Sequence, residues 1–560
     1  MIDQTQKLDN IIDEAVQKHR AGDLATAGSV YDAVLEQNPD HAEALHLKGV
    51  LLGQQGHADG ALKMLDRAAN AAPSDPRILG NRAKVLLDYG DVAGAIADYR
   101  AALEILPDDP NMHFNVAGAL AVDGKLEDAI HHLETACRVD SKHARALANL
   151  GNLYRHTGRL KDSARLLERA IESTPDDPQV QHSLGVTLSD GRRYEAAAAC
   201  FQCALELDKG FVRAAAQLFF CNLHSSDWKD HAKFIANFER MIESEGGLVS
   251  ELSPLIALFL PIDQASLNRV SDERAHSLRV RTNVTDSDEG RDKLHVGYIS
   301  ADLGSHPVGY LSADILGHHD RKAFKVSAIS LTPPDRSDVQ QSIFANVDKV
   351  LDVSRLSAAD AANQIRNAGV DILIDLGGFT RGARPEILAA RAAPLQLGWL
   401  GYCGSAGGLN DALLADQTVL PEVDAEHFSE AVAYLPGSFM PLNNFVAPST
   451  LHGSREEHGL PENGFVFCAF NAPTKIDPKS FDCWMNILMQ VEGSVLWLRE
   501  HTGVTTRNLE RAALDRGVDP ARLIFAPMVD GMEDHLARHR HADMFLDTFV
   551  YGAHSTAADA

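Results

Sequence analysis

The N-terminal part of the chain carries a 34-residue lattice of apolar, small and proline positions. Each period contains two stretches in which apolar residues recur with helical spacing. Small residues let two helices approach, large residues fill the space beside them, and proline ends the second helix. The large positions are Tyr31, Leu65, Tyr99, Leu133, Leu167 and Phe201, the small ones are Gly49, Ala83, Ala117, Gly151 and Gly185, and the prolines are Pro39, Pro73, Pro107 and Pro175. Six units over residues 6–209 predict helix pairs that stack into a superhelix with a concave groove.

This lattice resembles the tetratricopeptide repeat, and it assigns residues 1–209 to a repeat domain. One row of the lattice is polar: Asn81, Asn115 and Asn149 lie two places before the small residue in successive repeats. A side-chain amide can bond an extended peptide backbone without reading its side chains. We therefore expect these three residues to bind acceptor segments in the groove. The alternative is that they satisfy local backbone groups or face solvent.

From Leu294 onward, short apolar runs alternate with helix-like stretches. The runs are Leu294–Ile299, Phe324–Leu331, Val370–Leu376, Leu395–Leu400, Phe465–Phe470, Val495–Leu498, Leu523–Phe525 and Met544–Leu546. Strands that alternate with helices predict parallel sheets with helices on both faces. A loop-rich stretch near residues 441–464 separates two sets of runs. We expect a helical connector at 210–291, then α/β lobes at 292–455 and 456–560, with ligands at the carboxyl ends of the strands.

Charge and cysteine content narrow the classes of function. The chain has 560 residues and a net charge of -26, which repels nucleic-acid phosphates and anionic lipids, so neither is an expected partner. The first residues do not form a secretory signal, and no apolar run has the length of a membrane span. Seven cysteines, an odd number, favour a reducing compartment, and we expect a cytoplasmic protein.

Six stretches of the chain carry a resemblance to a known family. They are VGYISADLGSHP (296–307), GFTRGAR (378–384), WLGYCGSAG (399–407), NAPTKIDP (471–478), SVLWL (494–498) and ADMFLDTFVYGAHST (542–556). With the repeats in front, the chain resembles the protein O-GlcNAc transferase family, which includes the Spindly-like proteins and bacterial members. The resemblance implies an α-solenoid followed by a two-lobed α/β glycosyltransferase of the GT-B type. It also implies inverting transfer of N-acetylglucosamine from UDP to Ser or Thr hydroxyls of proteins, without a metal or other cofactor.

Two segments offer groups that suit a departing diphosphate. Lys475 provides a cation in a loop that directly follows the strand expected at 465–470. His554, Ser555 and Thr556 follow another strand and open a short helix, where free N–H groups and two hydroxyls favour an anion. The resemblance places the matching lysine on the diphosphate, so we expect Lys475 to be catalytic. An ordinary surface lysine and an ordinary helix cap are the alternatives.

Three further residues would hold the nucleoside. His535 and Arg538 are three positions apart and therefore share one helix face. The resemblance implies that His535 stacks on uracil, that Arg538 hydrogen-bonds it, and that Asp559 holds the ribose hydroxyls. A solvated helix face and a solvated Asp559 are the alternatives.

His306 is the candidate general base. It follows the first strand of the first lobe, and histidine titrates near neutral pH, so it can take the proton of an acceptor hydroxyl. The resemblance points to the same histidine. The alternatives are a structural loop residue or a residue that positions the sugar.

The chain also departs from the pattern that it resembles. Ala472 stands where glutamine is common and Met532 where lysine is common, so GDP-fucose remains an alternative to UDP-N-acetylglucosamine. The chain stops at Ala560, directly after the last motif, so we expect a truncated second lobe with weak or no activity. A repeat scaffold with an inactive catalytic half is the alternative function. The expected partners are extended protein segments in the groove and a nucleotide sugar, and the repeats could also pair two copies of the chain.

Overall fold

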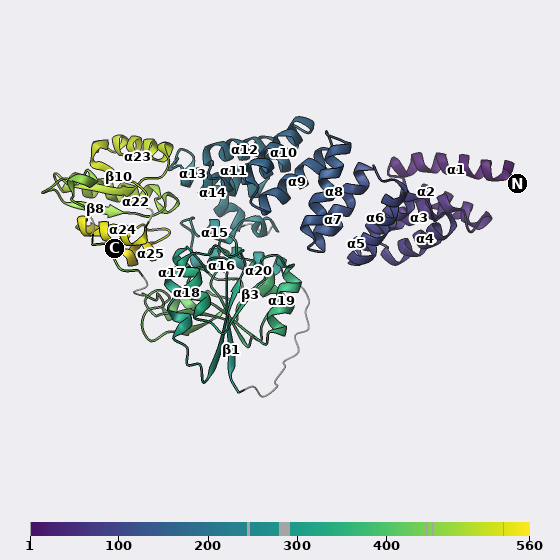
Figure 1. Ribbon diagram of the computed structural model, residues 1–560. Coiled ribbons are helices and arrows are strands. Elements are labelled where there is room, and N and C mark those ends of the chain that lie inside the picture. Colours follow the sequence, from purple (N-terminus) through teal and green to yellow (C-terminus); the bar gives the residue numbers. More distant parts are fainter. Residues whose placement is uncertain (1, 244–246, 279–291, 443–445, 451–452, 530) are drawn as a thin grey trace. The chain divides into compact units, whose positions relative to one another are not determined.

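The computed structural model describes residues 2–560 apart from 244–246, 279–291, 443–445, 451–452 and 530. It contains two compact units, Met1–Gly191 and Arg192–Ala560, and each is described separately below (Figure 1). The domain boundary expected after residue 291 falls next to residues outside the described part of the chain.

The first unit consists of consecutive helices that pack in pairs along the chain (Figure 1). They are α1 (Ile2–Arg20), α2 (Leu24–Gln37), α3 (Ala42–Gln54), α4 (Ala58–Ala71), α5 (Pro76–Asp88), α6 (Val92–Ile105), α7 (Pro110–Val122), α8 (Leu126–Val139), α9 (Ala144–His156), α10 (Leu160–Ser173) and α11 (Pro178–Asp190). The solenoid of tetratricopeptide type that the lattice predicts is therefore confirmed.

The lattice positions take the packing roles that their sizes predict. A Cβ atom added at Gly151 would lie 2.8 Å from Cγ of Leu167, and one added at Gly49 would lie 2.6 Å from Cγ of Leu65. Both leucines are fully buried. The small residues thus set how closely the paired helices approach. Glycines in the turns adopt φ between 77° and 91°, which side chains disfavour; they are Gly22, Gly56, Gly90, Gly124 and Gly158.

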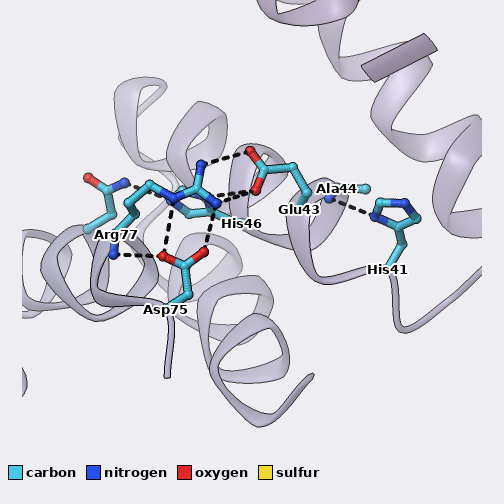
Figure 2. A network of polar contacts seen from close by, with 7 residues as sticks. His41, Glu43, Ala44, His46, Asp75 and Arg77 are labelled. Atoms are coloured by element: carbon cyan, nitrogen blue, oxygen red, sulfur yellow. Dashed lines mark hydrogen bonds and ion pairs between the residues drawn. The ribbon is translucent and has the colours of Figure 1, made fainter. Parts of the chain in front are cut away.

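A polar network joins the second and third repeats (Figure 2). Arg77 on α5 pairs with Glu43 on α3 at 2.8 Å and with Asp75 at 2.7 Å. Glu43 also lies 3.9 Å from Nδ1 of His46. The Arg77 side chain is 60% exposed, so each of these ion pairs contributes at most about 1 kcal/mol. Their main effect is to fix the side chains that face the neighbouring repeat.

The second unit begins with helices. They are α12 (Tyr194–Leu207), α13 (Val212–His224), α14 (His231–Glu243), the 3-10 turn η1 (Gly247–Glu251), α15 (Pro254–Ala257) and α16 (Gln264–Leu278). An apolar cluster that includes Phe219, Phe238, Ile256 and Leu260 buries the contacts between them. Cys200 and Cys203 lie on α12 as free cysteines, of which Cys200 is half-buried and Cys203 is exposed.

A seven-stranded parallel sheet follows, with strand order β3-β2-β1-β4-β5-β6-β7. Its strands are β1 (Leu294–Ser300), β2 (Phe324–Ser330), β3 (Lys349–Asp352), β4 (Ile372–Asp375), β5 (Leu395–Gly398), β6 (Ala412–Ala415) and β7 (Ala431–Tyr434). The accompanying helices are α17 (Pro307–Ser312), η2 (Ile315–Gly317), α18 (Asp338–Ala345), α19 (Ala358–Asn367), α20 (Pro385–Ala389) and α21 (Glu422–Ala425). Two apolar clusters cover the two faces of the sheet.

A second parallel sheet has four strands in the order β10-β9-β8-β11. Its strands are β8 (Val466–Ala469), β9 (Val495–Arg499), β10 (Leu523–Ala526) and β11 (Met544–Phe545). The helices and turns around it are η3 (Glu456–His458), η4 (Pro473–Lys475), α22 (Pro478–Gln490), α23 (Gly503–Asp515), η5 (Pro520–Arg522), α24 (Met532–Arg538), η6 (His539–His541) and α25 (Ser555–Asp559). The α-solenoid followed by two parallel α/β sheets confirms the predicted fold class.

Some elements differ from the prediction. All eight apolar runs contain strands, but β3, β6 and β7 have no counterpart among them. Strand β3 (KVLD) has only two apolar residues between charged ends, so its apolar signal is weak. Strands β6 (ALLA) and β7 (AVAY) are apolar throughout, and the sequence-based prediction misses them although the signal is present. None of the helices in the described part of the chain combines the length and apolarity that a membrane span needs.

The close contact at Gly151 leads to a testable prediction. Gly151→Ala should lower the free energy of unfolding by about 1 kcal/mol, because overpacking against Leu167 outweighs the gain in helix propensity. The matched control is Gly118→Ala on α7, where an added Cβ meets no atom within 4 Å. This control should raise the free energy of unfolding by about 0.5–1 kcal/mol.

Urea denaturation of the full chain, followed by far-ultraviolet circular dichroism, measures both changes. Equal effects of the two substitutions would contradict the packing role of the small residues.

Candidate active site

The second unit contains a cavity of about 430 Å³ at the carboxyl ends of the smaller sheet's strands. Phe470 directly follows β8, Arg499 ends β9, and Met528 lies two residues beyond β10. Because these strands are parallel, their carboxyl ends lie at one edge and bring distant sequence segments together. The cavity is also lined by His306, Pro307, Tyr310, Met532, His535, Arg538, Ser555, Thr556 and Asp559.

Lys475 lies beside this edge, at the end of η4. Its ammonium donates a hydrogen bond to the backbone oxygen of Gly552 at 3.0 Å and lies 4.5 Å from the ring centre of Tyr551. Burial lowers the pKa of Lys475, while nearby Cys403 and Asp547 act in the opposite direction. The structure therefore brings this amine next to the segment that leads into residues 554–556.

The loop between β11 and α25 is held by Asp547 and by α22. The Asp547 carboxylate accepts hydrogen bonds from the N–H groups of Thr548 and Ala553, both at 2.7 Å. Trp484 on α22 donates from its indole nitrogen to the backbone oxygen of Asp547 at 3.3 Å, and Ser480 accepts the N–H of Phe549 at 3.0 Å. Since α22 begins three residues after Lys475, one helix positions both sides of the site.

His554, Ser555 and Thr556 lie where this loop enters α25. Burial, with a smaller effect from Lys475, lowers the pKa of His554 to about 4, so this side chain is neutral at pH 7. The Ser555 and Thr556 hydroxyls line the cavity and bond none of the described residues. Helix α25 has only five residues, fewer than two turns, so its dipole is small and the hydroxyls are the stronger donors.

His535 and Arg538 contact each other, as their spacing predicts. Arg538 donates one Nη2 hydrogen bond to Nδ1 of His535 at 2.6 Å and one Nη1 hydrogen bond to the backbone oxygen of Pro527 at 2.9 Å. Its guanidinium also lies over the Phe470 ring at 4.4 Å. Burial, with nearby Arg538, lowers the pKa of His535 to about 3. Arg538 thus fixes a neutral His535 whose proton is on Nε2.

Asp559 lies on the same side of the cavity, 3.8 Å from Nε2 of His535. Its side chain is only 19% exposed, although it is the second-last residue of the chain. Burial raises the pKa of Asp559 to about 6, so the carboxylate is charged at pH 7 beside a neutral histidine. This arrangement leaves its oxygens able to accept hydroxyl hydrogen bonds.

His306 caps the N-terminus of α17 on the other wall of the cavity. Its Nδ1 accepts the N–H of Val308 at 3.3 Å and lies 3.7 Å from Asp302. In this tautomer the proton is on Nε2, so Nε2 is a donor. A base role at Nε2 requires the other tautomer, whose Nδ1–H would face the Asp302 carboxylate. Burial raises the pKa of Asp302, and the neighbouring His306 opposes that effect.

The three asparagines of the first unit lie at equivalent positions on α5, α7 and α9. Asn81 donates its amide to Nε2 of His46 at 2.7 Å, so that amide is already engaged. Asn115 is half-buried, Asn149 is exposed, and neither side chain bonds another described residue. Two of the three amides are thus available to a bound peptide.

Three residues near the site have no place in the sequence-based prediction. They are Arg499, Asp547 and Asp302. Arg499 ends β9, Asp547 directly follows an apolar run, and Asp302 lies two residues beyond the end of β1. A charged residue at or just beyond the carboxyl end of a strand is the signal that could have identified them.

Comparisons with known proteins identify the family of the chain and its repeats. The model of glycosyl transferase family 41 matches residues 266–447 and 443–560, and a tetratricopeptide repeat model matches 19–85 and 122–185. The chain is 30% identical over 353 residues to the probable UDP-N-acetylglucosamine–peptide N-acetylglucosaminyltransferase SEC of Arabidopsis thaliana. That match covers 59% of this chain and 36% of the relative.

Two further matches are a curated sequence and a solved structure. The UDP-N-acetylglucosamine–peptide N-acetylglucosaminyltransferase of Caenorhabditis elegans is 24% identical over 460 residues, which covers 60% of this chain and 40% of the relative. The chain thus spans well under half of the length of these two curated relatives. The solved structure of a mutant Thermobaculum terrenum O-GlcNAc transferase matches with a TM-score of 0.55 at 25% identity, over 80% of each chain.

The neutral histidines predict an acid-sensitive fold. Burial is the main cause that lowers the pKa of His501 and His535 to about 3 and that of His539 and His554 to about 4. The unfolded chain binds these protons near pH 6.5, whereas the folded chain does not. Stability should therefore be full above about pH 6.5 and should fall as the pH decreases towards about 4.

Thermal unfolding between pH 7.5 and 5 measures this slope. His539→Asn should make the slope shallower, while the control His318→Asn, at an exposed position, should leave it unchanged. A melting temperature that is constant over this range would contradict the burial of neutral histidines.

Proposed function

The chain belongs to glycosyl transferase family 41, and from this premise we propose that it transfers N-acetylglucosamine from UDP-N-acetylglucosamine to Ser and Thr hydroxyls of proteins. The observation that carries the proposal is the meeting of Lys475 with the loop that leads into Ser555 and Thr556, at the edge of a cavity of nucleotide size. The Arabidopsis and C. elegans relatives are named for the same donor and for a peptide acceptor.

In this proposal, UDP is the leaving group and negative charge develops on its diphosphate. Lys475 supplies a cation, and the Ser555 and Thr556 hydroxyls supply donors that no described residue uses. Donors that are already in place lower the barrier because they need no reorganisation as the charge develops. Under this proposal these groups stabilise the charge on the diphosphate without a divalent metal.

The nucleoside is proposed to lie against His535, with Asp559 on the ribose. Neutral His535 offers a flat apolar face, and its orientation is fixed by Arg538. The charged Asp559 carboxylate accepts hydroxyl protons, as acidic residues do in dinucleotide sites.

The acceptor hydroxyl is proposed to approach from the side of His306. Inversion requires attack on the face of the sugar opposite to UDP, and His306 lies on the wall of the cavity formed by α17. With its proton on Nδ1 towards Asp302, its Nε2 takes the proton of the hydroxyl as the new glycosidic bond forms.

The repeats are proposed to present extended acceptor segments. Asn115 and Asn149 have side-chain amides that no described residue engages, and amides bind a peptide backbone independently of its sequence.

The test of this function is transfer of N-acetylglucosamine to proteins of a cell extract, detected by intact-protein mass. Lys475→Met should lower the rate by about 10²–10³-fold and weaken UDP binding, because one diphosphate donor is lost. The matched control is Lys479→Met, four residues away on α22, which should retain both. Chelation with EDTA should leave the rate unchanged.

Nucleotide binding by the same protein decides between two alternatives to this function. One is GDP-fucose as the sugar donor, and the other is a repeat scaffold with an inactive catalytic half. Ala472 and Met532 lack the polar side chains common in similar proteins, so GDP and GDP-fucose are tested beside UDP and its sugar. Preference for GDP would replace the donor in the proposal. Absence of binding to both nucleotides would leave the repeat scaffold as the function.

A further inference from the structure

Arg499 is the last residue of β9 and lines the same cavity as the proposed nucleotide site. Strand β9 pairs with β8 on one side and β10 on the other, so Arg499 lies at the middle of the edge where the ligand is expected.

The contacts of Arg499 fix one end of its guanidinium and leave the other free. Its Nε donates to Nε2 of His501 at 3.4 Å, and His501 in turn bonds the backbone of Asn471 after β8. In the described part of the chain, Arg499 pairs with no carboxylate, and its two Nη groups add no hydrogen bond to the one from Nε. A guanidinium has five N–H donors, so four remain for a ligand.

The surroundings of Arg499 make an unpaired charge unfavourable. Burial lowers the pKa of Arg499, and the like charge of Arg192 adds to this effect. Arg499 also contributes to the lowered pKa values of His535 and Arg538. A partly buried cation among other cations is costly unless an anion compensates it, and groups of this kind cluster at functional sites.

We propose that Arg499 is a further residue that binds the nucleotide sugar. Its guanidinium would donate two hydrogen bonds to the phosphate that is attached to the nucleoside. The proposal rests on the proposed function, because it takes UDP as the occupant of the cavity. The nucleobase and ribose are neutral, so only the diphosphate brings the compensating charge. Arg499 lies close to His535 and Arg538 at the nucleoside end, whereas Lys475 lies at the other end beside Gly552. Arg499 would thus bind the phosphate next to the nucleoside, and Lys475 the phosphate next to the sugar. A planar guanidinium binds a phosphate through two parallel hydrogen bonds.

Calorimetry of the full chain with UDP and with uridine tests this role. Arg499→Ala should weaken UDP binding by about 10–100-fold, as expected for hydrogen bonds to a charged group, and change uridine binding less than about 2-fold. Arg499→Lys keeps the charge but loses the two parallel hydrogen bonds, so its affinity for UDP should lie between those of the wild type and of Arg499→Ala. The control Arg507→Ala, at an exposed position on α23 outside the cavity, should bind UDP as the wild type does.

Each outcome decides the proposal. Loss of UDP affinity with uridine affinity retained supports it. Unchanged UDP affinity in a folded Arg499→Ala chain overturns it while leaving the proposed function intact. Equal loss for UDP and uridine also overturns it, since the contact would then be to the nucleoside. If the wild type binds neither UDP nor GDP, the proposed function and this proposal both fail. If Arg499→Ala does not fold, Arg499→Lys decides by the same comparison.

Discussion

Parallel pairing of β8, β9, β10 and β11 is the constraint on which the rest of the site depends. Because every strand runs in one direction, the four segments that follow the strands emerge at a single edge. That edge collects an amine from one connection, a guanidinium from the next, a histidine–arginine pair from the third and two hydroxyls from the last. Helix α22 then ties the first and last of these connections to each other through Trp484 and Ser480.

The electrostatics of this edge follow from its burial. Lys475, Arg499 and Arg538 are all partly removed from water, and burial lowers the pKa of each. Burial also keeps the neighbouring His535 and His554 neutral at pH 7, so these two histidines add no positive charge to the edge. A ligand with negative charge would offset the cost of burying these cations, as the proposed diphosphate does. The net charge of -26 over the whole chain makes this local excess of cations more distinctive.

Much of this arrangement is readable from the sequence. The lattice of small and large residues predicts the solenoid because helix packing is local and repeats every 34 residues. The apolar runs predict eight strands and miss β3, β6 and β7. Only β3 (KVLD) lacks an apolar run, whereas β6 (ALLA) and β7 (AVAY) are apolar but are not recognised as strands. Lys475 lies within one of the family-like stretches, whereas Arg499 directly follows the stretch SVLWL (494–498) and is not singled out from the sequence. Its role depends on which strands become neighbours, and that order is a property of the folded sheet.

The most direct test of the central claim is a crystal structure of the chain with UDP, grown without divalent metal ions. The account predicts diphosphate oxygens within about 3.2 Å of the Lys475 ammonium and of the Ser555 or Thr556 hydroxyl. A diphosphate that faces away from Lys475, or a UDP molecule outside the cavity at the edge of the smaller sheet, would contradict it.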